Sequence, residues 1–124
     1  MKTNVSFTIL SYNDGDMVVD AIMSIKKLKT KYKFDIFVVD NGSKDGTPLF
    51  IKRVFNNVRV ISLNKNVGTA AYDAAIKKSR SKYIFFTGCD IEVKSDMLDK
   101  LVNFMEKNPD VALATPKCID FYNK

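Results

Sequence analysis

The sequence lacks histidine and tryptophan, and it has only two cysteines among its 124 residues. Without histidine, Ser-His-Asp and Cys-His catalysis are excluded, as is every zinc site that relies on imidazole. Two cysteines cannot form a four-thiolate site either, and Cys89 and Cys118 are predicted to be free thiols. Any chemistry must therefore rest on carboxylates, hydroxyls, lysines and backbone groups, together with a hard cation that prefers oxygen ligands.

Long apolar runs are also missing, since none approaches the roughly 20 residues that a membrane span needs. The first residues lead directly into an alternating strand pattern without a signal peptide, which predicts a cytoplasmic protein. Hydrophobic residues make up 46% and charged residues 27% of the chain. That composition is typical of a globular protein and excludes disorder, collagen and coiled coil. The length predicts one domain, residues 1–124, that folds without disulfides or a structural metal.

Basic side chains outnumber acidic ones, 20 to 14, so the formal net charge is +6. The densest basic segment is 26–33, where the first helix is expected to end. A solvated helix C-terminus is the favoured interpretation, because cations stabilise that end of the helix dipole. Peripheral contact with an anionic membrane surface stays open as an alternative. No aromatic residues interleave with these lysines in a nucleic-acid-binding motif, so no nucleic-acid partner is expected.

Five apolar, β-branched runs alternate with helical patterns along the chain. The predicted strands are 5–10, 34–39, 58–63, 83–86 and 111–115, and the predicted helices are 16–28, 47–55, 68–79 and 95–106. This alternation predicts an α/β, Rossmann-like doubly wound fold, with a mostly parallel sheet and helices on both faces. Right-handed crossovers then place the carboxyl ends of the strands at one edge, where ligands bind in such sheets.

Small, polar and acidic residues follow four of the predicted strands. The four segments are Ser11-Tyr12-Asn13-Asp14, Asp40-Asn41-Gly42-Ser43-Lys44-Asp45-Gly46, Asn64-Lys65-Asn66-Val67-Gly68 and Thr87-Gly88-Cys89-Asp90-Ile91-Glu92. Turns alone favour these residue types, but aspartates at two strand ends, Asp40 and Asp90, indicate a site. Such carboxylates accept hydrogen bonds from a base or sugar, or ligate a cation. Neither a dinucleotide fingerprint nor a P-loop is present.

The succession VSFTILSYN, FDIFVVDNGSKDGT, NKNVGTAA and YIFFTGCDIEV resembles the nucleotide-sugar-binding half of family 2 glycosyltransferases, which have the GT-A fold. The resemblance extends over about 5–116, and FDIFVVDNGSKDGT is its most specific part. It implies that the nucleotide base is held by Ser11, Tyr12, Asn13 and Asp40. The wider nucleotide-sugar site implied by the resemblance adds Asn41, Gly42, Asn66, Gly68, Gly88, Cys89 and Asp90.

The acidic motif departs from the family pattern. Family members usually carry Asp-x-Asp after the fourth strand, which binds the ribose and the divalent metal on the diphosphate. Here the motif is Gly88-Cys89-Asp90, so Asp90 alone is left as the implied ligand of Mn²⁺ or Mg²⁺. Glu92 is interpreted as a surface residue. Relatives also carry an Arg-Asn pair near Tyr72 and Asp73, to which we assign no role from the sequence.

The resemblance predicts an inverting transfer of a sugar from a UDP-, dTDP- or GDP-linked donor to a hydroxyl of an acceptor glycan or lipid-linked sugar. Members of the family are longer, and their second half carries the acceptor platform and the general base, for which no residue here is a match. The chain is then a piece of a longer enzyme, or it is completed by a partner or by homo-oligomerisation. The alternative is a non-catalytic nucleotide-sugar-binding module. A nucleotidyltransferase-like binder is disfavoured because no glycine-rich phosphate loop follows the first strand.

Overall fold

The computed structural model describes residues 4–120 of the chain. The strands are β1 (Val5–Ser11), β2 (Phe34–Asp40), β3 (Val58–Ser62) and β4 (Tyr83–Thr87). The helices are α1 (Gly15–Lys26), α2 (Thr47–Val54), α3 (Tyr72–Lys78) and α4 (Met97–Lys107), and the 3-10 turn η1 (Gly68–Ala71) leads into α3. The predicted helix 68–79 is thus split into a tighter first turn and a short α-helix.

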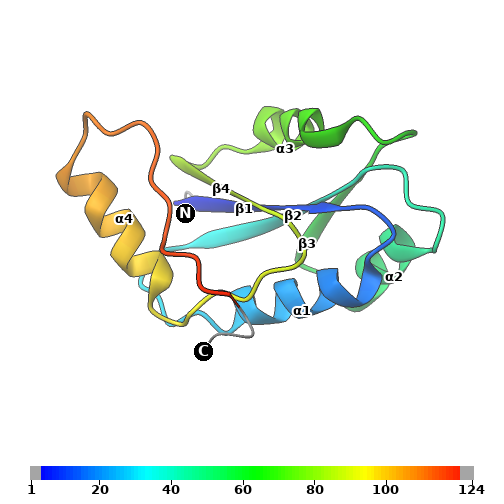
Figure 1. The fold of residues 1–124 in the computed structure, drawn as a ribbon, viewed down its shortest axis with the longest axis horizontal. Helices are drawn as coiled ribbons and strands as arrows, with labels where there is room; N and C mark the ends of the chain where they lie inside the picture. Colours follow the sequence, from blue (N-terminus) through cyan, green and yellow to red (C-terminus); the bar gives the residue numbers. More distant parts are fainter. Residues whose placement is uncertain (1–3, 121–124) are drawn as a thin grey trace.

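The four strands form one parallel sheet with the order β3-β2-β1-β4 (Figure 1). The chain moves outward from β1 to β3 and then returns to the other side of β1 for β4. This reversal between β1 and β4 is the topological switch point of a doubly wound sheet, where ligands bind beyond the strand ends. Ser11 pairs with Asp40 and Ile9 with Thr87. The predicted strand ends therefore meet at one edge.

Helices cover both faces of the sheet, as the sequence predicts. In Figure 1, α1 and α2 lie on one side of the strands and α3 lies on the other. The larger core cluster joins inward residues of β1 and β2, such as Phe7 and Val38, to α1, α2 and α4. The smaller cluster places Ala71 and Ala75 against Phe37 and Val39 of β2. Alanines at the contact allow η1 and α3 to approach the sheet closely, because little side chain separates the two backbones.

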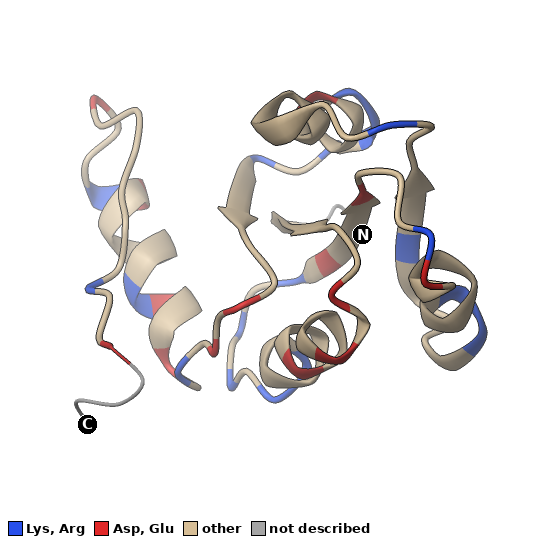
Figure 2. Ribbon diagram, turned by 45° about the vertical axis from the view of Figure 1, so that its right-hand side comes forward, with Lys and Arg blue, Asp and Glu red and all other residues tan. Residues whose placement is uncertain are grey.

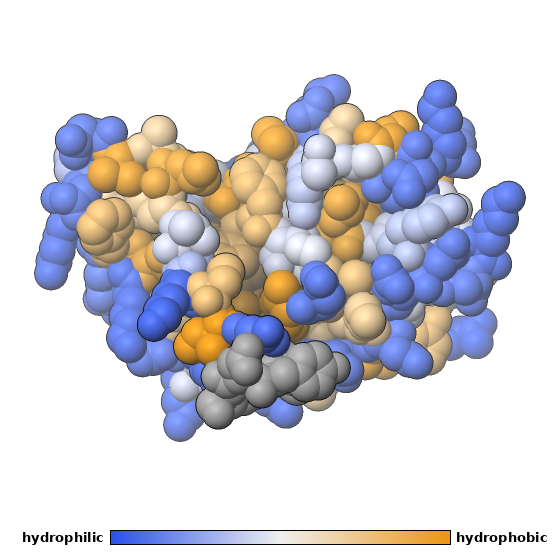
Figure 3. All heavy atoms as spheres, in the orientation of Figure 1, coloured by the Kyte–Doolittle hydropathy of each residue, from blue (hydrophilic) through white to orange (hydrophobic). Residues whose placement is uncertain are grey.

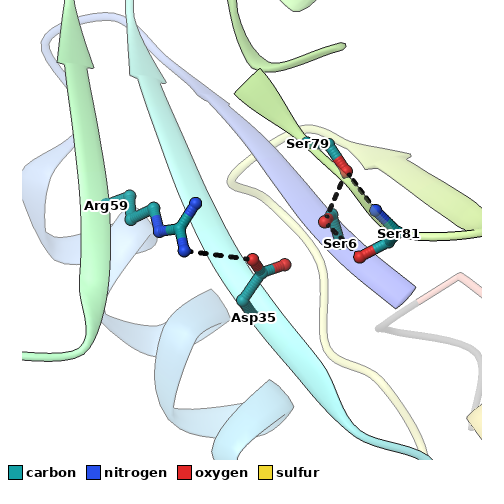
Figure 4. Close-up of polar contacts among 5 residues, drawn as sticks. All are labelled: Ser6, Asp35, Arg59, Ser79 and Ser81. Atoms are coloured by element: carbon teal, nitrogen blue, oxygen red, sulfur yellow. Dashed lines mark hydrogen bonds and ion pairs between the residues drawn. The ribbon is translucent and has the colours of Figure 1, made fainter. Parts of the chain in front are cut away.

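Hydroxyl groups fix the turn that leads from α3 into β4. Ser6 of β1 is fully buried, and its Oγ lies 2.7 Å from Ser79 Oγ and 2.8 Å from Ser81 Oγ (Figure 4). Figure 4 also shows Arg59 of β3 beside Asp35 of β2, with Nη2 and Oδ2 3.9 Å apart. The Arg59 side chain is largely exposed, so this ion pair adds little stability. The serine cluster instead fixes where β4 begins beside β1.

The predicted fifth strand is wrong. Residues 111–115 form no strand, and Leu113 in this segment is 82% exposed. After α4 the chain runs beside that helix and outside the sheet (Figure 1). An alternating apolar pattern produces a strand only where a neighbouring strand pairs with its backbone groups, and this segment has no such neighbour within residues 4–120.

β4 is consequently an edge strand among residues 4–120. Its sequence, YIFFT, is apolar on both faces, a pattern typical of a central parallel strand. Four of its five residues are nevertheless only partly buried or exposed, and Phe86 is 44% exposed. In Figure 3 the surface dips between α4 and the rest of the molecule, and hydrophobic side chains are visible in that dip.

Candidate functional site

Ser11 and Asp40 lie side by side at the carboxyl edge, since they are register partners at the ends of β1 and β2. Each is only 1% exposed. Both oxygens of the Asp40 carboxylate accept hydrogen bonds from Ser43: Oδ2 from the backbone N at 2.7 Å and Oδ1 from Oγ at 2.6 Å. The carboxylate thus closes the turn after β2, and it keeps lone pairs for further donors because each oxygen can accept two hydrogen bonds.

Two loops at this edge are tied to one another through Asn13. Its backbone is left-handed, with φ 53°. The backbone N donates to Ser43 Oγ at 2.8 Å, and its side-chain Oδ1 accepts from the backbone N of Lys44 at 2.9 Å. Tyr12, the residue before it, keeps its ring about half exposed. The segments predicted to hold the base therefore form one connected rim with an accessible aromatic ring.

Asn41 connects the same rim to the loop that leads into α3. Its buried side chain donates from Nδ2 to the carbonyl of Gly68 at 3.0 Å, and its Oδ1 accepts from the backbone N of Val67 at 3.2 Å. Asn66 Oδ1 in turn accepts from the backbone N of Gly68 at 2.8 Å. In the structure, Asn41 and Asn66 thus shape loops, and any contact with a ligand would be additional.

Gly42 lies close to the backbone of the loop after β3. Its φ is 85°, and a Cβ added there would lie 3.0 Å from Cα of Lys65. A side chain at this position would collide with backbone in a conformation that L-residues rarely adopt. Gly68 also has a positive φ, 64°, but a Cβ there would meet no atom within 4 Å. Gly42 and Gly68 therefore differ: packing requires the first glycine, and backbone conformation alone favours the second.

The acidic motif follows β4. Asp90 is exposed, whereas Cys89 is buried at 9% exposure and its Sγ lies 3.7 Å from Oδ2 of Asp14. Burial, followed by the negative charge of Asp14, raises the pKa of the Cys89 thiol to about 11. The thiol is therefore neutral at physiological pH and acts as a donor to the loop after β1. Of the motif, only the Asp90 side chain is open to solvent.

The metal-ligand set is small. Between residues 4 and 120, no group of three or more Cys, Asp or Glu side chains is placed to hold an ion. Magnesium usually keeps waters and takes one or two carboxylates together with phosphate oxygens. Asp90 is one exposed carboxylate of the kind that such an ion takes. Glu92 is exposed, in agreement with its interpretation as a surface residue.

Two open hollows flank this edge. One, of about 560 Å³, lies where α1 and α2 begin and includes Asn13, Asp14 and Asp45. The other, of about 790 Å³, lies between α1 and the segment after β4 and includes Cys89 and Asp90. Neither is lined by Ser11 or Asp40. The structure thus gathers the predicted residues at one edge without enclosing them in one cavity.

Sequence reasoning assigned no role to Tyr72, which the structure places against the end of β4, immediately ahead of the acidic motif. Its hydroxyl donates to the carbonyl of Thr87 at 2.8 Å, and its ring meets that of Phe86 edge-on, with 5.1 Å between the centroids. The only signal in the sequence was a large aromatic residue within the otherwise small-faced segment 68–75.

The lysine-rich segment lies at the opposite end of α1 from the site. Figure 2 shows basic residues along the loop that follows α1 and acidic residues along the segment that follows β4. Lys26 Nζ donates to Oδ1 of Asn57 at 2.7 Å, away from the carboxyl edge.

In residues 4–120, no helix combines the length and the apolar character that crossing a bilayer requires.

Comparisons with known proteins agree with this architecture. The model of glycosyl transferase family 2 matches residues 6–123. TuaG of Bacillus subtilis, named as a teichuronic acid biosynthesis glycosyltransferase, is 29% identical over 108 residues, which are 84% of this chain and 42% of TuaG. TarS of S. aureus, solved with UDP-GlcNAc, superposes with a TM-score of 0.75 at 22% identity over 86% of this chain and 32% of TarS.

A mannosyltransferase of Pyrobaculum calidifontis, solved with GDP-Man and Mn²⁺, gives a TM-score of 0.74 at 20% identity, covering 85% of this chain and 33% of that one. The chain thus spans less than half the length of each of these three proteins. The solved structures confirm the expected GT-A fold. The family model extends over nearly all of the described residues, and we conclude that the chain belongs to glycosyl transferase family 2.

Proposed function

We propose that this chain is the nucleotide-sugar-binding domain of an inverting glycosyltransferase. The observation that carries the proposal is the pairing of Ser11 with Asp40 at the carboxyl edge, where Asp90 follows the neighbouring strand across the switch point. Membership of family 2 supports it. Further support comes from the two solved proteins described above, one of which holds UDP-GlcNAc and the other GDP-Man with Mn²⁺.

In this proposal the rim formed by 11–13 and 40–43 receives the base. Tyr12 offers an exposed ring for stacking, and Asp40 offers carboxylate lone pairs to donors on the base edge. The hydroxyl of Ser11 has no hydrogen-bond partner among the described residues, although buried hydroxyls normally have one. An unpartnered polar group at this point favours a ligand or an ordered water at the rim.

Transfer would proceed by in-line attack of an acceptor hydroxyl on the anomeric carbon. The new glycosidic C–O bond forms as the bond to the nucleoside diphosphate breaks, the configuration inverts, and the hydroxyl proton passes to a general base. A divalent ion held by Asp90 and the diphosphate would neutralise the charge that develops on the leaving group. The contribution of this chain is positioning and electrostatic stabilisation. The acceptor platform and base would come from further chain, a partner or a second copy.

A non-catalytic binding module is the second candidate. One observation favours it: the acidic motif has a single exposed carboxylate, and Cys89 is engaged with Asp14 rather than with the ligand edge. Binding is common to both candidates, and turnover separates them. Release of a nucleoside diphosphate from a donor sugar in the presence of acceptors would favour the enzyme, and binding without release would favour the module.

A thermal-shift screen of UDP, GDP, dTDP and CDP, each with and without Mn²⁺, tests donor binding directly. A ligand at about 100 times its dissociation constant adds roughly 2.7 kcal/mol, which corresponds to a Tm rise of roughly 10 °C in a chain of this length. We expect one nucleotide to give a shift that grows with Mn²⁺. Asp90→Ala should remove only the Mn²⁺-dependent part, whereas Asp110→Ala, an exposed aspartate after α4, should keep it. No shift with any nucleotide would refute the proposed function.

A further inference from the structure

Tyr72 makes direct contacts with the end of β4, immediately ahead of the acidic motif. It is the first residue of α3, on the face of the sheet opposite α1. Its hydroxyl donates to the carbonyl of Thr87 at 2.8 Å, and its ring packs edge-on against Phe86. The last two residues of β4 are thus held from α3 as well as from the neighbouring strand.

The motif itself transmits the position of this backbone to the Asp90 carboxylate. A Cβ placed on Gly88 would lie 2.9 Å from Oδ1 of Asp90, so the carboxylate folds back over Gly88. Thr87 Oγ1 also donates to the carbonyl of Gly88 at 3.1 Å. Because Thr87, Gly88 and Asp90 lie within four residues, a displacement of the Thr87 carbonyl also moves the Asp90 oxygens.

The loop after β1 also contacts the motif, because the Cys89 thiol donates to Oδ2 of Asp14, with 3.7 Å between the two atoms. The motif is therefore fixed between α3 and the loop after β1. The pKa of Tyr72 is raised, chiefly because burial disfavours the phenolate and further because the ionised forms of Cys89 and Asp90 lie nearby. The hydroxyl consequently remains a donor at neutral pH.

We infer that Tyr72 is a positioning residue for Asp90, holding the one exposed carboxylate of the motif where a metal–diphosphate group can meet it. The effect on metal-dependent nucleotide binding rests on the proposed function, whereas the positioning of the motif rests on the hydrogen bond from Tyr72 to Thr87. Position matters more here than in a two-acid motif, because a single carboxylate has no second ligand to compensate for a shift. Without the hydroxyl, the Thr87 carbonyl loses its hydrogen bond to α3 while the ring contact with Phe86 remains, and Asp90 samples several positions.

The test compares Tyr72→Phe with Tyr32→Phe in the full 124-residue chain. The first variant keeps the ring against Phe86 and removes only the hydroxyl. The second also removes one tyrosine hydroxyl bond, the one donated to Oδ1 of Asn103, far from the carboxyl edge. Two quantities are measured for each protein. They are the ¹⁵N relaxation of the Gly88, Cys89 and Asp90 amides without ligand, and nucleotide affinity in Mn²⁺ against affinity in EDTA.

We expect Tyr72→Phe to increase the mobility of the motif amides. We also expect it to reduce the Mn²⁺-dependent gain in affinity about fivefold, the effect of losing one hydrogen bond, with affinity in EDTA unchanged. Tyr32→Phe should change neither quantity. Equal losses in Mn²⁺ and EDTA would show a general structural role and overturn the inference, as would unaltered amide mobility.

Failure of the proposed function is distinguishable from failure of this inference. If the unsubstituted protein binds no nucleotide in either buffer, the donor-binding proposal is refuted. The amide measurements need no ligand, and they still decide whether Tyr72 positions the motif. Mobile amides combined with an unchanged Mn²⁺-dependent gain would overturn the consequence drawn for metal binding.

Discussion

Two glycines with the same backbone conformation and different surroundings allow a sharp test of the rim geometry. Gly42 and Gly46 have φ of 85° and 81°. A Cβ on Gly42 would lie 3.0–3.2 Å from three backbone atoms of Lys65, whereas a Cβ on Gly46 would meet nothing within 4 Å. Alanine at either position incurs the same conformational penalty, and only alanine at 42 incurs a collision with backbone.

The magnitude follows from these two terms. A left-handed conformation costs an L-residue about 1–2 kcal/mol, partly offset by about 0.4–1 kcal/mol because alanine restricts the unfolded chain more than glycine. Gly46→Ala should therefore lower the free energy of unfolding by about 1 kcal/mol. Forcing the loops at 42 and 65 apart adds about 1–3 kcal/mol, the usual range for overpacking, so Gly42→Ala should lose about 2–4 kcal/mol.

Urea unfolding followed by circular dichroism measures both variants on the same scale. We expect the midpoint of Gly42→Ala to fall clearly below that of Gly46→Ala, with similar slopes for all three proteins. In thermal unfolding the difference corresponds to roughly 4 °C for each kcal/mol. Equal losses would refute the close approach of Gly42 to Lys65, because conformation alone would then account for both variants.

Two further predictions concern buried polar groups at the same edge. The pKa of Cys89 is raised to about 11 from an ordinary value near 9. We therefore expect iodoacetamide at pH 8 to modify the exposed Cys118 first and Cys89 roughly a hundredfold more slowly, because the thiolate fraction of Cys89 is smaller. Peptide mass spectrometry measures both rates, and equal rates would contradict the burial of Cys89. Since the thiolate is disfavoured in the folded state, this group's contribution to stability is complete below about pH 9 and is lost as the pH rises toward 11. Asn41→Ala removes two hydrogen bonds of a buried amide, and we expect it to lower the free energy of unfolding in urea by about 2–3 kcal/mol. Asn66→Ala removes one hydrogen bond at an exposed position and should lower that free energy by about 1 kcal/mol or less. Equal losses would contradict the bridging role of Asn41.

Most of the architecture could be predicted from the sequence because its strands carry their own local signals. The runs that became β1 and β2 are buried on both faces, and both end in polar turn residues, so their bounds were predicted within one residue. The segment 111–115 has a similar apolar pattern and is not a strand. A segment becomes a strand only where a neighbouring strand hydrogen-bonds to its backbone, and a local sequence pattern does not show whether such a neighbour is present.

For the site residues as well, the sequence predicted their position in the fold but not their contacts. The edge at which Asp40 and Asp90 lie followed from topology alone, because the carboxyl ends of parallel strands meet. The partners of those residues did not follow: Ser43 on Asp40, Asp14 on Cys89 and Tyr72 on Thr87. The last two contacts join residues that are not neighbours in the sequence. Such contacts depend on how side chains pack in the folded protein, which the spacing of residues in the sequence does not predict.

The two sides of the proposed donor site differ in how firmly they are held. On the base side, three loops are joined by hydrogen bonds: Asn13 N donates to Ser43 Oγ, and Asn41 Nδ2 donates to the carbonyl of Gly68. Such a rim is already ordered before a ligand arrives, and binding there loses little conformational entropy. On the diphosphate side, the motif depends on one bond from Tyr72 and one weak thiol contact. In the proposed function, affinity for the base should therefore survive changes at the acidic motif, whereas the Mn²⁺-dependent gain in affinity should fall when either contact is removed.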